Sequence, residues 1–266
     1  MSESEQRFGE FVVVRRHEQG HVAELVLDRP KAMNAVSTGM ARSLGAACDA
    51  LAADRDVRVT VLTSSNDRAF CVGADLKERN SFSDADLVRQ RPTARGAYTG
   101  VLELPMPTVA AVHGFALGGG FELALSCDVI VADETAVVGL PEVSVGVIPG
   151  GGGTQLLPRR VGAARAAELV FTARRVEAAE ARELGLVDVL AKDARTEALE
   201  LAAQIAVNSP VGLRNAKKAM RLGQGLDLRA GLEVEDAAWR ATAFSGDRAE
   251  GVAAFNEKRK PAWPGE

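Results

Sequence analysis

The chain has 266 residues, 47% of them hydrophobic, with a formal net charge of −4 at pH 7 and a pI of about 5.6. This length and apolar content suit one large domain with a substantial core. The acidic balance argues against a general nucleic-acid or anionic-membrane binder. No apolar run approaches the roughly 18 residues that a membrane helix needs, and the opening MSESEQRFGE lacks the basic and apolar regions of a secretory signal. We therefore expect a cytoplasmic protein with no membrane and no nucleic-acid partner.

The cysteine and histidine content argues against a disulfide framework and against a metal centre. Cys48, Cys71 and Cys127 are odd in number and show no CxxC spacing, which is typical of reduced thiols in a core. The chain has only three histidines, so a histidine-rich metal site is not expected.

The first part of the chain shows strand signals alternating with helix signals. Short apolar runs predict strands at 21–28, 57–63, 108–112, 129–132 and 186–190. A helix is predicted after Ser37 and Thr38, which are good N-caps. Further helices are predicted at 121–127, 163–171 and 177–184, the last ended by Gly185.

Strand signals stop beyond about residue 195. Ser209 and Pro210 have the N-cap and N1 residue types that end one helix and begin another. Three or four helices are expected from there to Lys258. We therefore divide the chain into an α/β body at 1–195 and a helical region at 196–266.

The stretch GFALGGGFELALSCD (114–128) places three glycines directly before an apolar helical run that contains one carboxylate, Glu122. A glycine-rich turn at a helix N-terminus presents free backbone N–H groups and favours anions. A phosphate-binding loop is not supported, because Phe121 and Glu122 stand where lysine and serine or threonine are needed. The dinucleotide pattern GxGxxG fails at Leu123, and no GxSxG nucleophile motif is present.

Glu122 and Glu142 are the candidate acids. A glutamate in a first helical turn commonly complements the helix dipole at the surface, but the neighbours of Glu122 are apolar, which predicts a buried side chain. Glu142 follows Pro141 just before a second glycine cluster at 150–153, and on its own it would be an ordinary loop acid. Two semi-buried acids beside glycine turns favour proton transfer, because burial raises a carboxyl pKa toward neutrality.

A third motif, AFCVGADLKE (69–78), follows the strand predicted at 57–63. It fits an ordinary strand-to-helix loop. It also fits a second set of backbone N–H groups that converges with the one at 118–120. Two donors from separate loops form an oxyanion hole, which suits chemistry that passes through an enolate.

These motifs together resemble the enoyl-CoA hydratase (crotonase) family. The resemblance is carried by GADLKE, AAVHGFALGGGFELALSCD, GLPEVSVGVIPGGGGTQLLPRRVG and GVAAFNEKRKP, and it runs from about Val22 to Pro261. GADLKER, IPGGGGTQLLPR and GLEVEDAAW are most similar to methylglutaconyl-CoA hydratases and their bacterial relatives. The resemblance implies an α/β fold with a crotonase-like spiral of ββα units at 1–195. It also implies a helical oligomerisation region at 196–266 and a homotrimer or dimer of trimers.

The resemblance implies a reaction and its catalytic groups. Water would add across the 2,3 double bond of an enoyl-CoA thioester to give a 3-hydroxyacyl-CoA. The oxyanion hole would consist of the backbone N–H groups of Ala74 and Gly119, and the acids would be Glu122 and Glu142. No cofactor is implied, because coenzyme A is part of the acyl-CoA substrate.

The resemblance further implies two segments that bind coenzyme A. One is the loop at 74–77, largely through its backbone; the other is the C-terminal region around 255–258, often supplied by a neighbouring subunit. A lysine in the second segment suits the 3′-phosphate, although it also fits a solvated helix charge. The implied binding residues are Ala74, Asp75, Leu76, Lys77, Phe255 and Lys258.

More than one reaction type and more than one substrate are compatible with the resemblance. Isomerases, decarboxylases, dehalogenases and thioester hydrolases share the scaffold; isomerases generally lack one of the two acids, so the pair favours hydration. Leu140 stands where many short-chain hydratases have glutamine, and the segment 79–104 is expected to shape the acyl pocket. A methylglutaconyl-type substrate would need a basic group for its extra carboxylate, and that segment offers Arg79, Arg89, Arg91 and Arg95.

Two other function classes are disfavoured. An RNA-binding protein on this scaffold would need a basic surface, for example on the helix at 37–53, which holds one arginine and no lysine. A catalytically silent CoA-binding or scaffold protein would not need both Glu122 and Glu142.

Overall fold

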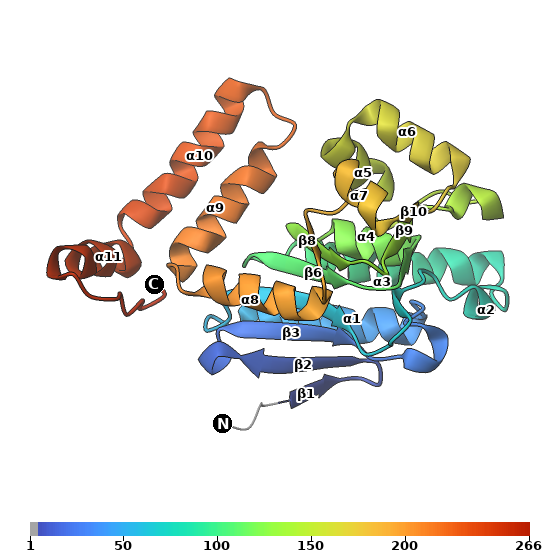
Figure 1. Cartoon of the computed structure of the whole chain (residues 1–266), viewed down its shortest axis with the longest axis horizontal. Helices are drawn as coiled ribbons and strands as arrows, with labels where there is room; N and C mark the ends of the chain where they lie inside the picture. Colours follow the sequence, from blue (N-terminus) through green and yellow to red (C-terminus); the bar gives the residue numbers. More distant parts are fainter. Residues whose placement is uncertain (1–4) are drawn as a thin grey trace.

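The computed structural model describes residues 5–266, and in this part of the chain the strands form two sheets (Figure 1). The larger sheet has seven strands in the order β1-β2-β3-β4-β6-β8-β11, and the smaller has four in the order β10-β9-β7-β5. The strands of the larger sheet are β1 (Glu5–Phe8), β2 (Val12–His17), β3 (Val22–Leu27), β4 (Val59–Ser64), β6 (Thr108–Val112), β8 (Val129–Asp133) and β11 (Val189–Ala191). Those of the smaller sheet are β5 (Ala69–Cys71), β7 (Phe115–Leu117), β9 (Val137–Gly139) and β10 (Val176–Glu177).

The chain winds as a spiral, because successive strands alternate between the two sheets. β4, β6 and β8 pair in parallel in the larger sheet, while β5, β7 and β9, which follow each of them, pair in parallel in the smaller one. Helical segments connect each turn to the next: α2 (Leu76–Arg79), α3 (Asp84–Leu102), α4 (Gly119–Leu125), α5 (Gly153–Val161), α6 (Ala163–Thr172) and α7 (Ala178–Glu183). The predicted spiral of ββα units is therefore confirmed.

Helices cover both faces of the larger sheet. On β3, the alternate residues Ala23, Leu25 and Leu27 join the main core, into which α1 (Thr38–Ala53) also packs. Val22 on the opposite face joins a second core with α8 (Ala194–Ala206). Four alanines of α8 at helical spacing allow it to lie close against the sheet: Ala194, Ala198, Ala202 and Ala206.

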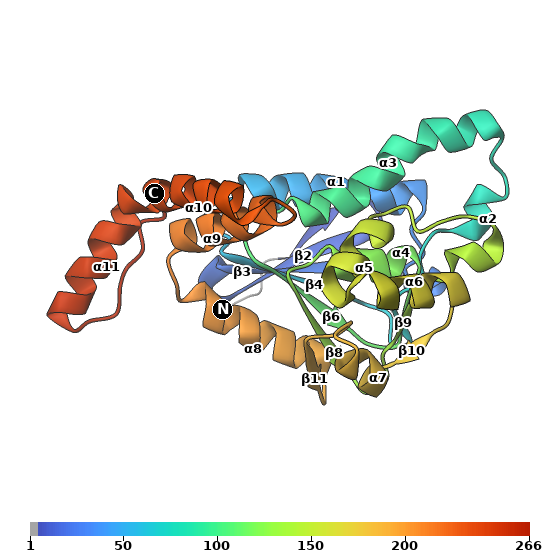
Figure 2. The same cartoon turned by 90° about the horizontal axis from the view of Figure 1, so that it is seen from above.

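The last three helices project away from the body (Figures 1 and 2). They are α9 (Pro210–Gly223), α10 (Leu228–Ala243) and α11 (Gly246–Glu257). Little of them is buried within one chain, and they expose large apolar side chains: Met220, Leu228, Leu232, Trp239, Phe244 and Phe255. Within residues 5–266, no helix has both the length and the hydropathy that crossing a bilayer requires.

Most predicted elements lie where the sequence placed them, and two are shifted. The strand at 108–112 has the predicted bounds, and α9 begins after the N-cap Ser209 as expected. The helix expected at 121–127 begins at Gly119. The strand expected at 186–190 is Val189–Ala191, because the N–H groups of Leu186 and Val187 both donate to Ala181 O at the end of α7.

Candidate active site

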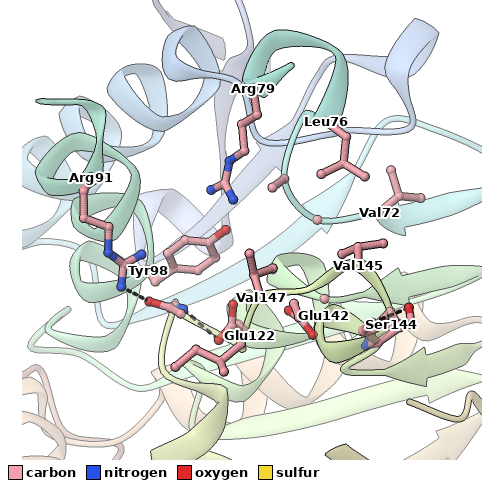
Figure 3. Close-up of a pocket in the computed structure, with 18 of the residues that line it drawn as sticks. Val72, Leu76, Arg79, Arg91, Tyr98, Glu122, Glu142, Ser144, Val145 and Val147 are labelled. Atoms are coloured by element: carbon pink, nitrogen blue, oxygen red, sulfur yellow. Dashed lines mark hydrogen bonds between the residues drawn. The ribbon is translucent and has the colours of Figure 1, made fainter. Parts of the chain in front are cut away.

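A pocket of about 530 Å³ lies where the loop before α2, the N-terminal turn of α4 and the segment after β9 meet (Figure 3). Its lining includes Ala74, Gly119, Glu122 and Glu142, the four residues predicted to act together. Gly119 and Glu122 share α4, whereas Ala74 and Glu142 lie on the turns before and after it, and the alternation of strands between the two sheets brings those turns side by side.

Glycine is required where two of these loops touch. Gly73 has a φ of +89°, and a Cβ atom on it would lie 2.7 Å from Leu117 O and 3.0 Å from Gly119 N. A Cβ atom on Gly120 would collide with Cys71 O. Side chains at these positions would therefore force the loop before α2 away from the start of α4.

Two backbone donors face the pocket. Gly73 O accepts from Val36 N and Asp75 N donates to Val36 O, so the intervening Ala74 N–H points the other way. Gly119 is the first residue of α4, where a helix leaves its N–H groups unpaired. Within the described residues, neither the Ala74 nor the Gly119 N–H donates to a protein acceptor. Together they form a pair of free donors at one end of the pocket.

Glu122 is held by backbone N–H groups from a loop about 30 residues downstream. The residue is 2% exposed, and its Oε1 accepts from Gly151 N at 2.7 Å and Gly153 N at 2.8 Å. Burial raises the pKa of this carboxyl above its usual range, against the opposing effect of those two N–H groups. The carboxylate is therefore fixed in position and titrates closer to neutrality than a surface glutamate.

Glu142 begins a short 3₁₀ helix (η3, Glu142–Val145) directly after Pro141. Its Oε2 is buried and accepts no hydrogen bond from the described residues. Burial, with the nearby Glu122 carboxylate adding to it, raises the pKa of Glu142 to about 7. A substantial fraction of its side chain is therefore protonated at neutral pH, which makes it able to give a proton.

The arrangement combines two kinds of group. The free N–H groups of Ala74 and Gly119 can stabilise negative charge on an oxygen atom. The carboxyl groups of Glu122 and Glu142 line the same pocket and can hold a water molecule and move protons. The geometry suits addition of water to, or proton transfer next to, a polarised carbonyl group.

A family model described as enoyl-CoA hydratase/isomerase matches residues 17–266. The chain belongs to the enoyl-CoA hydratase/isomerase family. It is 42% identical over 250 residues to the enoyl-CoA hydratase domain-containing protein 2 of Mus musculus, covering 92% of this chain and 84% of the relative. It is 41% identical to the methylglutaconyl-CoA hydratase of Mus musculus, covering 92% of this chain and 80% of that protein. The crystal structure of an enoyl-CoA hydratase from Bacillus anthracis superposes with a TM-score of 0.92 at 39% identity, covering 97% of this chain and all of that one.

The loop predicted to bind coenzyme A in this family member lies at the rim of the pocket. Ala74 and Leu76 line the pocket, and Leu76 is exposed. Asp75 is instead engaged within the protein: its side chain pairs with Arg29 at 2.7 Å and caps α2 by accepting from the N–H groups of Lys77 and Glu78. The Lys77 side chain is exposed at the surface outside the pocket lining.

The C-terminal residues predicted to bind coenzyme A are not near the pocket within one chain. Phe255 on α11 is 84% exposed, and Lys258 caps α11 with a φ of 54°. Neither lines the pocket, and α11 lies at the opposite end of the molecule from α2 (Figures 1 and 2). If these residues contact coenzyme A, they do so at the pocket of another copy of the chain.

The structure adds Tyr98 to the pocket, which sequence patterns did not single out, and it locates two of the four candidate arginines there. Tyr98 on α3 lines the pocket, with its hydroxyl against Gly119, and Arg91 donates to Gly150 O at 2.6 Å. Arg79 also lines the pocket, whereas Arg89 and Arg95 do not. The segment 79–104 therefore does contribute to the pocket wall. Leu140 is buried beneath the glycine loop, where a Cβ atom on Gly153 would lie 2.8 Å from Leu140 Cδ1.

Proposed function

We propose that this family member hydrates a 2-enoyl-CoA thioester to the corresponding 3-hydroxyacyl-CoA. The observation that carries the proposal is the presence, in one pocket, of two glutamates with raised pKa values beside a pair of free backbone donors. Hydration needs acid–base groups, because a proton must be removed from water and another delivered to carbon. It also needs hydrogen-bond donors, because negative charge develops on the thioester oxygen.

The donor pair would bind the thioester carbonyl oxygen. Negative charge develops on this oxygen as water adds to C3, and the N–H groups of Ala74 and Gly119 would stabilise it. Loss of one such donor typically lowers the rate about 10²–10³-fold. Backbone donors suit this role because the packing around Gly73 and Gly120 fixes them before the substrate arrives.

The environments of the two acids favour distinct roles. Glu122 receives two backbone hydrogen bonds that favour its charged form, so it would take the proton from water as the new C3–O bond forms. Glu142 receives none on its buried Oε2 and has a pKa of about 7, so it would donate a proton to C2 of the enolate. Transfer of a proton from Glu122 to solvent and uptake of one by Glu142 would restore the starting state.

Coenzyme A would enter past the loop at 74–77. We further propose that Phe255 and Lys258 complete its binding from a neighbouring subunit in a homotrimer or dimer of trimers. Their distance from the pocket within one chain and the exposed apolar side chains of α9–α11 support this arrangement. No metal or redox cofactor is part of the proposal, since the substrate itself carries coenzyme A.

Double-bond isomerisation is the competing reaction on this scaffold, and the relatives carry the names of both activities. Isomerisation moves a proton from one carbon to another and needs no water-holding pair. The presence of both Glu122 and Glu142 at the same pocket favours hydration.

The test is a panel of kcat/KM measurements with crotonyl-CoA, longer straight-chain enoyl-CoA thioesters, 3-methylcrotonyl-CoA and 3-methylglutaconyl-CoA. At least one should give a 3-hydroxyacyl-CoA without added metal or nucleotide. Folded protein that binds coenzyme A but hydrates none of them would contradict the proposal. Migration of the double bond without hydration would favour the isomerase alternative.

A further inference from the structure

Arg79 is a charged side chain of the pocket that the proposed hydration chemistry does not use. It is the last residue of α2, it is half-buried, and it lines the pocket. Figure 3 shows its side chain extending from α2 toward Tyr98. Burial raises the pKa of the Tyr98 hydroxyl, and the positive charge of Arg79 acts against this rise, in agreement with a guanidinium group on the pocket side of α2.

The Arg79 guanidinium has no protein partner within residues 5–266. Its neighbours in sequence show the contrast: Arg91 donates to Gly150 O, and Arg89 pairs with Asp86 at 2.6 Å outside the pocket. No hydrogen bond or ion pair joins Arg79 to Glu122, whose Oε1 is taken by Gly151 and Gly153. Arg175, the remaining arginine of the lining, is exposed, so solvent hydrates its charge.

An unpaired, half-buried guanidinium discriminates between acyl groups. A plain alkyl chain that filled this part of the pocket would remove water from Arg79 and offer no hydrogen bond in return, which is unfavourable. A carboxylate would replace the lost water with up to two charge-assisted hydrogen bonds, because the planar guanidinium matches its geometry.

The rest of the site limits where such a carboxylate could be attached. In the proposed function, the thioester oxygen lies at Ala74 and Gly119, and the double bond lies beside the two glutamates. An anionic group that reaches Arg79 would therefore belong to the acyl chain beyond the double bond.

We propose that Arg79 is a specificity-determining residue that binds a carboxylate carried by the acyl chain. The preferred substrates are then coenzyme A monothioesters of unsaturated dicarboxylic acids. This inference rests on the proposed function, since it assumes that the pocket binds an acyl-CoA in the orientation described above.

The experiment compares two thioesters of similar length, one anionic and one neutral: glutaconyl-CoA and trans-2-hexenoyl-CoA. Each is assayed for hydration with the native protein, Arg79→Gln, Arg79→Lys and the control Arg89→Gln, which removes an arginine from the same segment outside the pocket. Arg79 makes no hydrogen bond in the protein, so Arg79→Gln should fold, and its melting temperature checks this. Binding of the saturated analogues glutaryl-CoA and hexanoyl-CoA is measured separately by calorimetry.

We expect the native protein to favour glutaconyl-CoA over hexenoyl-CoA by at least about tenfold in kcat/KM. Arg79→Gln should lower kcat/KM for glutaconyl-CoA and weaken glutaryl-CoA binding by about tenfold to hundredfold, the usual effect of a hydrogen bond to a charged group. Its activity on hexenoyl-CoA should stay the same or rise, because a neutral amide costs less to desolvate than a guanidinium group. Arg79→Lys should recover part of the loss, and Arg89→Gln should match the native protein.

Equal effects of Arg79→Gln on the two thioesters would overturn the inference, because Arg79 would then act on the shared thioester group. So would a native protein that hydrates hexenoyl-CoA at least as well as glutaconyl-CoA. In both cases the proposed hydration would stand. Glutaryl-CoA binding that depends on Arg79, with neither thioester hydrated, would instead support the carboxylate site and overturn the proposed function.

Discussion

The hydroxyl group of Tyr98 occupies the space where a Cβ atom on residue 119 would lie. Gly119 supplies one of the two free backbone donors. The Tyr98 side chain on α3 therefore leaves no room for a side chain at this donor position. A Gly119→Ala variant should therefore be destabilised by about 1–3 kcal/mol, the usual cost of overpacking a core. Chemical denaturation of the variant and the native protein measures the difference.

The paired variant Gly119→Ala/Tyr98→Phe tests the cause. Removing the hydroxyl leaves the ring carbon Cζ, 3.2 Å from the added Cβ, as the nearest atom, so the double variant should regain most of the stability lost by Gly119→Ala. Tyr98→Phe alone is the control. No recovery in the double variant would show that the backbone at Gly119, and not the Tyr98 contact, requires glycine.

Glu122→Gln and Glu142→Gln should each lower kcat by several orders of magnitude. Proton transfer alone contributes about 10²–10⁴-fold, and loss of water placement adds to this. The double variant should be little worse than either single one, because the two groups act on one water. Near-normal hydration by one of the variants would make that glutamate structural, and strictly additive losses would argue against a shared water.

The pH dependence of kcat/KM should be bell-shaped, with the alkaline limb near pH 7. Glu142 must be protonated to donate, and its pKa is about 7, so activity should fall as pH rises through that value. At low pH, protonation of Glu122 should remove the base and lower activity again. A profile measured from about pH 5 to about pH 9 checks this, and a flat response between pH 6 and 9 would contradict the role of Glu142 as the acid.

Glu142→Gln should gain stability relative to the native protein as pH rises. The pKa of Glu142 is raised from 4.5 to about 7 in the folded protein. The folded state therefore holds this proton more tightly than the unfolded state, and the native protein loses stability between about pH 4.5 and about pH 7. Glutamine cannot ionise, so the difference in melting temperature should grow across that window and stay constant above it. A difference that is independent of pH would show that this carboxyl is not buried in its charged form.

The C-terminal helices predict self-association. Phe244 is 90% exposed, and Trp239 and Leu228 are also largely exposed on α10 and its C-terminal cap; apolar side chains in such number on one element usually mark an interface. Light scattering at micromolar concentration should show a trimer or hexamer. Phe244→Ser should weaken the assembly, whereas Val88→Ser, an exposed apolar position on α3, should not. A monomeric native protein would refute this and remove the basis for a role of Lys258 at a neighbouring pocket.

The helices and strands with clear apolar or capping patterns in the sequence lie where they were predicted. The apolar run at 108–112 and the N-caps Ser37 and Ser209 give β6, α1 and α9 where expected. The motifs also indicated that Ala74, Gly119, Glu122 and Glu142 belong together, and the structure places them in one pocket, although their catalytic roles stay predictions.

The elements that were not predicted have weak patterns or depend on distant partners. α3 buries apolar residues only in its C-terminal half, among them Tyr98 and Val101, and it contains Pro92, so its helical periodicity is faint. β10 has two residues and exists through its pairing with β9. Likewise, the presence of Arg79 in the pocket depends on which segments the fold brings together there, and sequence order alone does not contain that information.

Glu122 is oriented by backbone N–H groups that only glycine leaves accessible: a Cβ atom on Gly151 would lie 2.8 Å from its Oε2, and one on Gly153 would lie 3.0 Å from its Oε1. No side chain of the loop takes part in holding this carboxylate. Chemical similarity is therefore a poor guide to tolerated substitutions here, since alanine would intrude as surely as a charged residue would. The loop therefore limits side-chain size at Gly151 and Gly153, whereas Thr154 and Gln155 directly beside them are exposed and face no such limit from Glu122.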